Sequence, residues 1–88
     1  MKNWADYSFI VRSEHRKKVF ESLSAPKTPT QVAKDLKIDL GYVSNIIISL
    51  LERKLVVCLN PGEKRHRLYE RSKKGKDLFT QMSKMKDN

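Results

Sequence analysis

Apolar and polar positions alternate along the chain in a way that predicts several short amphipathic helices. The first apolar residues, over 4–11, show no clear period, so we assign no element to them. Ser13 is a favourable N-cap and predicts a helix over 14–23. Its apolar stripe consists of Val19, Phe20 and Leu23. The segment after it, 24–27, contains a proline and ends this helix.

A second helix is predicted to begin after Thr28. Pro29 occupies the first helical position, and Gln31 stands three residues after Thr28, which is the capping-box pattern. The helix is short and ends at Leu36. We expect its inward side chains to be Val32, Ala33 and Leu36.

A third and longer helix is predicted over 40–53, with Asp39 as its N-cap. At about 100° per residue, one side of this helix carries Val43, Ile46, Ile47 and Leu50. The opposite side carries Gly41, Ser44, Asn45, Ile48 and Glu52. Two helices joined by a turn of about three residues, the second with a small and polar outer face, form a helix-turn-helix.

A β-hairpin is predicted next, because β-branched and aliphatic residues over 55–59 are followed by an Asn60-Pro61-Gly62 turn. The chain returns through a second strand over 67–70. The connecting tip is basic and carries Lys64, Arg65 and His66. Such a hairpin directly after a helix-turn-helix is a wing.

The last segment predicts an amphipathic helix over 72–86. Its apolar residues are Leu78, Phe79, Met82 and Met85. The fold class is therefore mainly α with a small β-hairpin: a winged helix-turn-helix with a three-helix core, a two-stranded wing and a C-terminal helix. The length of 88 residues leads us to expect one domain over 1–88.

Charge narrows the choice of partners. The chain has 19 Lys and Arg against 10 Asp and Glu, a formal net charge of +9, which attracts polyanions. Nucleic acid and an anionic membrane are both candidates on charge alone, beside a basic surface that is merely soluble. No segment has the pattern of a signal peptide or of a membrane span, so we expect no membrane association. The single cysteine, Cys58, excludes an internal disulfide, which agrees with the cytoplasmic location that we expect.

The order of these elements resembles the winged helix-turn-helix regulators of the MarR and ArsR type, especially their short archaeal members. The resemblance covers about residues 8–80. Its marks are Thr28-Pro29-Thr30-Gln31-Val32-Ala33-Lys34-Asp35-Leu36, Tyr42-Val43-Ser44-Asn45 with Ile47 and Leu50, Leu55-Val56-Val57, Arg67-Leu68-Tyr69, and Lys74-Gly75. It implies a transcriptional regulator that binds double-stranded DNA.

The chain departs from the family pattern at Lys54, where the family usually has a left-handed glycine before the first wing strand. A non-glycine residue in that conformation costs on the order of 1 kcal/mol, so we expect the corner to be built differently. The predicted helix over 40–53, which corresponds to the recognition helix of this family, is also unusually apolar. It contains three consecutive isoleucines, of which Ile48 should face outward.

The resemblance implies that the N-terminal half of the 40–53 helix enters the major groove. The DNA-binding candidates there are Leu40, Gly41, Tyr42, Ser44, Asn45 and Ile48. Asn45 can pair with adenine, whereas guanine readout should be poor because no Arg or Lys precedes Arg53 in this helix. The alternative interpretation is that these residues do not contact DNA and are ordinary solvent-facing residues.

Further contacts are expected from the basic wing over 60–67 and from the start of the second helix. The wing candidates, for the minor groove or phosphates, are Lys64, Arg65, His66 and Arg67. Thr30 and Gln31 are phosphate candidates near a helix N-terminus, whereas Thr28 is better explained as the cap.

Aromatic residues and methionine gather at the two ends of the chain. These residues are Trp4, Tyr7, Phe9, Phe79 and Met82. They either cover the domain's own core or form a homodimer interface, as relatives often do with terminal helices.

Other activities have little support in the sequence. The scattered His15, Cys58 and His66 lack the spacing of a metal site, and no catalytic or phosphate-loop motif is present, so we expect no cofactor, no metal and no enzyme. Two alternatives to a sequence-selective regulator stay open: an architectural DNA-binding protein with little sequence preference, and a protein-interaction module anchored by Ile48 and the terminal aromatics.

Overall fold

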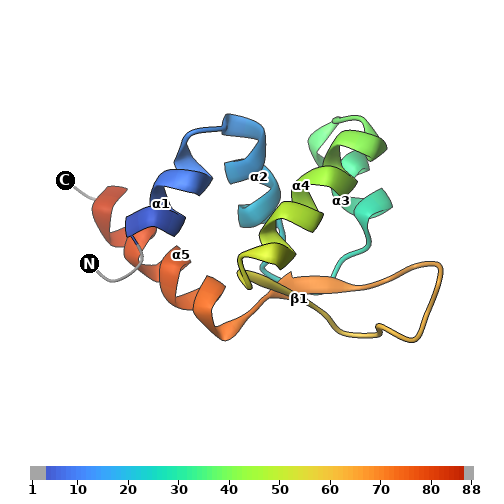
Figure 1. The fold of residues 1–88 in the computed structure, drawn as a ribbon. Helices are drawn as coiled ribbons and strands as arrows, with labels where there is room; N and C mark the ends of the chain where they lie inside the picture. The colour runs from blue at the N-terminus through green and yellow to red at the C-terminus, as the bar shows by residue number, and fades with distance from the viewer. Residues whose placement is uncertain (1–3, 87–88) are drawn as a thin grey trace.

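The computed structural model describes residues 4–86, with side chains as far as Lys84, so the Met85 side chain lies outside the described part. Within these described residues, five helices and a two-stranded sheet follow one another (Figure 1). They are α1 (Trp4–Val11), α2 (Glu14–Ser22), α3 (Pro29–Leu36), α4 (Leu40–Glu52), β1 (Val56–Cys58), β2 (Tyr69–Arg71) and α5 (Lys73–Lys86). The winged helix-turn-helix expected from the sequence is confirmed.

The predicted helix starts are confirmed by their capping hydrogen bonds. The Ser13 hydroxyl accepts from the Arg16 N–H at 3.3 Å, and the Asp39 carboxylate accepts from the Tyr42 N–H at 3.2 Å. Thr28 and Gln31 form the complete capping box. These bonds satisfy N–H groups that have no partner within their own helix, which places each helix start at its expected residue.

The sheet is antiparallel, with Val56 opposite Arg71 and Cys58 opposite Tyr69. Strand β1 is shorter at both ends than the predicted strand over 55–59. Strand β2 begins and ends later in the chain than the predicted strand over 67–70. Tyr69 also pairs on its other side with Lys27, through hydrogen bonds of 3.0 and 2.9 Å between their backbones. The turn between α2 and α3 is thereby attached to the wing.

The core forms between the helices and one face of the sheet. Val43, Ile46, Ile47 and Leu50 of α4 are buried, as the helical period predicted. The other buried apolar residues of the core are Ile10, Val19, Phe20, Leu23, Val32, Leu55, Val56, Tyr69, Leu78 and Met82. Every helix contributes to this cluster, so packing holds α4 against all of its neighbours.

The corner between α4 and β1 corrects the expectation for Lys54. Lys54 does adopt the left-handed conformation, with φ 61°, so the corner is built as a glycine would build it. The Lys54 N–H donates to the Leu51 carbonyl and the Leu55 N–H to the Leu50 carbonyl, which is a Schellman motif. These two bonds and the full burial of Leu55 offset the strain of about 1 kcal/mol.

The first helix, α1, is an element that the apolar pattern did not predict. One of its two buried residues is Asp6, whose carboxylate lies 3.1 Å from Arg53 Nη1 and 3.1 Å from Lys74 Nζ. A buried carboxylate interrupts the apolar stripe, and this explains the missing period. The ion pairs connect α1 with the end of α4 and the start of α5.

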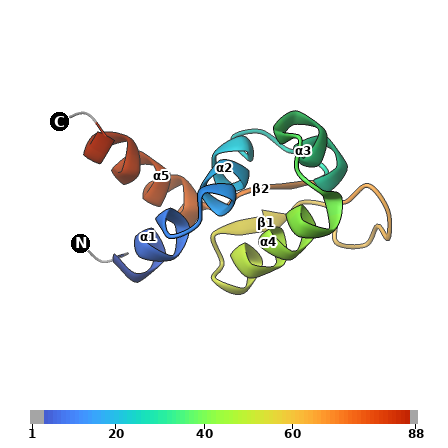
Figure 2. The same ribbon diagram turned by 90° about the horizontal axis from the view of Figure 1, so that it is seen from above.

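The molecule is elongated, with principal extents of 40 × 25 × 19 Å. Helices α1 and α5, and with them both chain ends, lie at one end, while the wing loop (residues 59–68) projects from the other (Figure 2). Within residues 4–86, no helix combines the length and apolar character that crossing a membrane requires.

Candidate nucleic-acid interface

Helix α4 presents one continuous outward ridge. Gly41, Asn45 and Ile48 are exposed and Ser44 is half-buried, as predicted from the helical wheel. The Asn45 side chain has no hydrogen-bond partner within the described part of the chain. Its carboxamide is therefore free to pair with an outside group.

The start of α3 lies beside this ridge but is partly committed to its own cap. Gln31 Oε1 accepts from the Thr28 N–H at 2.9 Å, and the Thr28 hydroxyl accepts from the Gln31 N–H at 3.2 Å. Thr28 is thus the cap, as expected. Thr30 is exposed and its hydroxyl is not used within residues 4–86, whereas Gln31 uses its Oε1 in the cap and has an amide NH₂ without a partner there.

The wing loop is shaped by Asn60, a residue in which the sequence indicated only a turn. Its Oδ1 accepts from the Leu68 N–H at 2.7 Å, and its Nδ2 donates to the His66 carbonyl at 3.2 Å. One side chain therefore ties the outgoing and returning arms together. This holds the basic tip in a defined shape although the strands themselves are short.

The four basic residues of the wing loop are all exposed but not equally free. Arg67 Nε donates to the Glu63 carbonyl at 2.6 Å, and this fixes its guanidinium along the loop. Lys64 and Arg65 have no ion-pair or hydrogen-bond partner in the region that the structure describes. Their charges are the most available to an anion.

Three of the predicted segments meet around one shallow hollow of ≈ 280 Å³. It is lined by Thr28, Pro29, Thr30, Leu40, Ser44, Lys64, His66, Arg67 and Tyr69. Of the other DNA-binding candidates, Gly41, Tyr42, Asn45 and Ile48 lie on the exposed face of α4, and Gln31 and Arg65 are exposed nearby in the chain. The fold therefore brings the α3 start, the α4 start and the wing together.

His15 is a neighbour of this surface that sequence reasoning missed. Its imidazole meets the Tyr42 ring edge-on, with ring centroids 5.3 Å apart and an interplanar angle of 78°. The contact places the start of α2 beside the start of α4. A lone histidine in the first turn of a helix carries no sequence signal for such a contact, which only the packing of α2 on α4 creates.

The terminal aromatic residues lie at the opposite end of the molecule and differ in their surroundings. Met82 is in the core, and Phe9 lies between the guanidinium groups of Arg16 and Arg53, 3.9 and 4.0 Å from its ring centroid. Trp4 is 58% exposed and stacks on Tyr7. Trp4 is therefore the member of this group most available to a partner.

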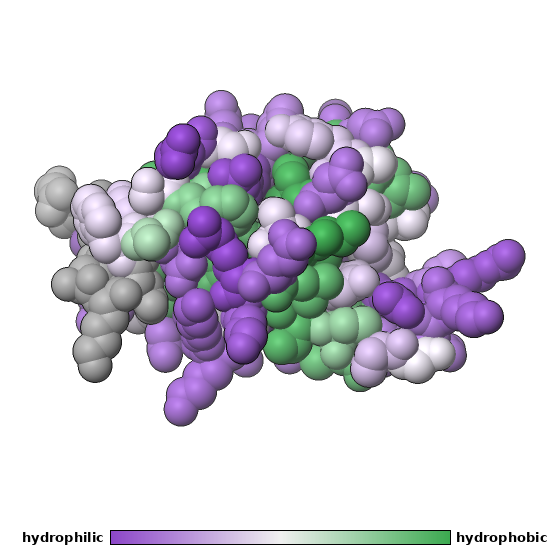
Figure 3. Space-filling view, viewed as in Figure 1, coloured by the Kyte–Doolittle hydropathy of each residue, from purple (hydrophilic) through white to green (hydrophobic). Residues whose placement is uncertain are grey.

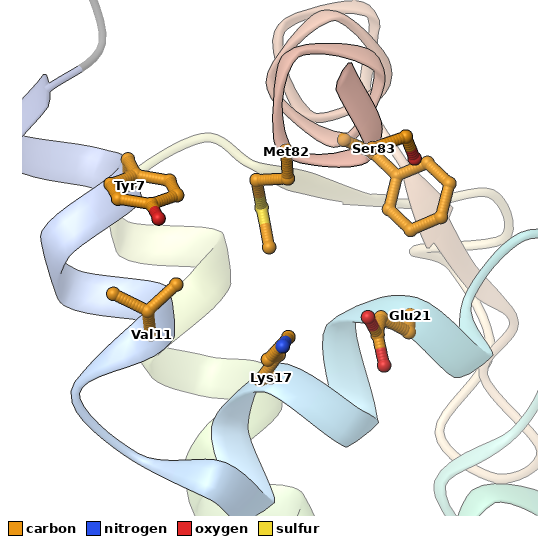
Figure 4. A pocket seen from close by; sticks show the side chains of 7 residues that line it. Tyr7, Val11, Lys17, Glu21, Met82 and Ser83 are labelled. Atoms are coloured by element: carbon orange, nitrogen blue, oxygen red, sulfur yellow. The ribbon is translucent and has the colours of Figure 1, made fainter. Parts of the chain in front are cut away.

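Between α1, α2 and α5 there is a small pocket of ≈ 120 Å³ (Figure 4). Tyr7 and Val11 approach it from α1, Lys17 and Glu21 from α2, and Met82 and Ser83 from α5. Phe79 completes the lining and covers the buried Arg71 guanidinium, which lies 3.8 Å from its ring centroid. Burial lowers the pKa of Arg71, and the nearby Glu21 carboxylate opposes that shift.

Metal ligands are not grouped in the described region. Among residues 4–86, no three His, Cys, Asp or Glu side chains are close enough to hold a metal ion together. Cys58 is half-buried in β1, with its Sγ 3.7 Å from Asn60 Oδ1. The geometry assigns this cysteine to the base of the wing.

Comparison with family models finds no match, and a search of curated proteins finds none either. Solved structures do match. A homodimeric winged helix-turn-helix DNA-binding domain of Mb0332 from Mycobacterium bovis, described as a possible ArsR-family regulator, aligns with TM-score 0.79 at 16% identity, covering 98% of this chain and 80% of that one. A point mutant of MepR from S. aureus aligns with TM-score 0.77 at 20% identity, covering 98% of this chain and 66% of that one.

A mutant of MarR from E. coli, solved in complex with operator DNA, aligns with TM-score 0.74 at 27% identity. The alignment covers 89% of this chain and 58% of that one, so the chain spans less than two thirds of the length of this structure and of MepR. These three neighbours are bacterial, and the likeness to archaeal members stays a prediction. The chain has the winged helix-turn-helix fold that MarR-family and ArsR-family transcription regulators share.

Proposed function

We propose that this protein binds double-stranded DNA sequence-selectively as a transcriptional regulator, with α4 in the major groove and the basic wing on the minor groove or phosphates. The observation that carries the proposal is the geometry of one end of the molecule. There the exposed ridge of α4 lies beside the wing loop, and Lys64 and Arg65 at its tip have no partner within residues 4–86. The major groove is wide enough for such a ridge, and free cations suit the phosphates beside it.

Similarity in fold supports the same function. The MarR structure contains operator DNA, and the Mb0332 fragment is a DNA-binding domain. The excess of positive charge on this chain, +9, agrees with a polyanionic partner. A regulator of this kind would act in the cytoplasm.

We further propose a homodimer formed at the end where α1 and α5 lie. Trp4 projects from that end, and the Mb0332 domain is homodimeric. Two protomers would place their α4 helices about 34 Å apart and select a pseudo-palindromic site. The interface prediction for Tyr7, Phe9, Phe79 and Met82 rests on their place in this region rather than on exposure, since Met82 is buried.

The first experiment is a selection of binding sites from random duplexes at physiological salt. It reports affinity, sequence preference and half-site spacing together. A selected site bound about 10³-fold or more tightly than random DNA supports a regulator. A ratio near one would favour the architectural alternative, and no binding to any duplex would refute the proposed function.

Arg65→Ala tests the wing. Because Arg65 is expected to contact the DNA backbone or the minor groove, the variant should weaken binding to most sequences alike and lower the salt-dependence slope by about one. Lys18→Ala, which removes an exposed cation on α2 outside both the wing and the proposed dimer end, is the matched control and should bind as the parent does. Equal losses in both variants would point to general charge and not to a wing contact.

Asn45→Ala tests the ridge. The loss of one amide–adenine pair should relax preference at a single base position, at a cost of about 1–3 kcal/mol on the preferred site. The selected motif of the variant, compared position by position with that of the parent, measures this. A uniform fall in affinity at every position would contradict base readout by Asn45.

A protein-interaction surface is the second candidate function. Five of the seven exposed large apolar residues in the described chain lie on α4 and the wing: Leu40, Tyr42, Ile48, Val57 and Leu59. Partner binding that is insensitive to salt, together with no affinity for duplex DNA, would establish this alternative.

A further inference from the structure

The three consecutive isoleucines of α4 have different surroundings. Ile46 and Ile47 are buried in the core, whereas Ile48 is 53% exposed on the outward ridge. Leu40, at the start of the same helix, is 46% exposed. The core therefore explains two of the isoleucines and leaves Ile48 without a structural role inside the protein.

The ridge between these two aliphatic residues is small and uncharged. It carries Gly41, Ser44 and Asn45, and α4 contains no Arg or Lys although the whole chain has 19. Figure 3 shows an apolar patch over part of α4 and β1, with hydrophilic side chains on both sides. The positively charged side chains therefore lie around the ridge of α4 and are absent from the ridge itself.

The floor of the major groove offers one apolar group, the C5-methyl of thymine, and aliphatic side chains recognise it by contact. Guanine is read mostly by Arg or Lys, and α4 has neither. Ile48 is β-branched, so its χ1 angle is restricted in a helix and little side-chain freedom is lost on contact. The chemistry of the ridge suits thymine and adenine.

We propose that α4 selects A·T base pairs by packing Ile48 and Leu40 against thymine methyl groups, with Asn45 pairing with adenine between them. This inference rests on the proposed DNA-binding function and names the bases that it reads. The two aliphatic residues are eight positions apart, about 12 Å along the helix. With base pairs about 3.4 Å apart, they contact thymines separated by about three to four base-pair steps.

The test replaces single thymines by deoxyuridine in the selected duplex, which removes only the methyl group. At two positions in each half-site, about three to four steps apart, the parent protein should bind about fourfold more weakly, the factor expected for one buried methyl-sized group. At the other thymines deoxyuridine should change nothing. This measurement uses the unaltered protein and so does not depend on the stability of a variant.

Two variants then assign each methyl group to its side chain. Ile48→Ala should abolish the deoxyuridine effect at one position and Leu40→Ala at the other, as a double-mutant cycle measures. Leu59→Ala, which truncates an aliphatic residue of similar exposure (45%) on the wing, is the matched control and should keep both effects. Both α4 side chains are exposed, and circular dichroism of each variant checks that the fold is kept.

Equal binding of thymine and deoxyuridine duplexes would overturn this inference while leaving DNA binding intact. A selected site rich in G·C pairs at the α4 contacts would overturn it too. If no duplex binds at all, the proposed function itself fails, and the exposed Ile48 would then be assigned to a protein partner.

Discussion

Gly75 provides a sharp test of how the wing is attached to the last helix. A Cβ built at Gly75 would lie 2.0 Å from the Leu55 carbonyl oxygen and 3.1 Å from its carbon. Leu55 belongs to the corner between α4 and β1, and its carbonyl also accepts the Ser72 N–H at 3.0 Å. Any side chain at residue 75 must therefore push α5 away from this corner.

The sign of the effect of Gly75→Ala separates two explanations. If Gly75 were only a helical residue, alanine would stabilise the protein by up to about 1 kcal/mol. The close contact is with backbone, which moves less readily than a side chain, and relief requires a shift of about 1 Å. Overpacking of this kind costs about 1–3 kcal/mol, and a 2.0 Å contact with a backbone atom belongs in the upper half of that range. After the gain from helix propensity is subtracted, we expect a net loss of about 1–2 kcal/mol.

Urea unfolding followed by circular dichroism measures this change, and thermal unfolding should show a midpoint lowered by about 5–15 °C. Gly62→Ala is the matched control, because nothing lies within 4 Å of a Cβ there and its φ is not positive. The control should be neutral or slightly stabilising. A Gly75→Ala protein as stable as the parent would refute the close packing of α5 on the corner.

Two other substitutions test the contacts that connect the ends of the helices. Asp6→Asn should lower the free energy of unfolding by about 1–3 kcal/mol in urea titrations, a value between those of exposed and buried ion pairs. The reason is that Asp6 is buried, whereas its partners Arg53 and Lys74 are half-exposed. An unchanged unfolding midpoint would contradict this. Lys54→Gly should raise stability by up to about 1 kcal/mol by relieving the left-handed strain, and a loss of stability would show that the lysine side chain contributes more than its backbone costs.

Features that depend on residues close together in the chain could be predicted from the sequence. The caps at Ser13, Thr28 and Asp39 are bonds between residues three positions apart, so the local residue types specify them. The division of α4 into a buried and an exposed side follows from the helical period, which places Ile48 outward and Ile47 inward.

Features that join distant residues could not be predicted in this way. The α1 helix is held by an ion pair between residues 47 positions apart, and its buried Asp6 removes the apolar period that would have revealed it. The contact of His15 with Tyr42 and the position of Gly75 against Leu55 also depend on how helices pack.

The sequence alone therefore determined which segments after residue 13 become helices, where most of them begin and which face of α4 is free. The tertiary structure decided how that face, the α3 start and the wing converge on one hollow, and which wing cations stay unpaired. The physical reason is the range of the interactions. Capping and helical periodicity act between residues within one or two helical turns. The hollow forms only when segments far apart in the chain are joined, as the backbones of Lys27 and Tyr69 are.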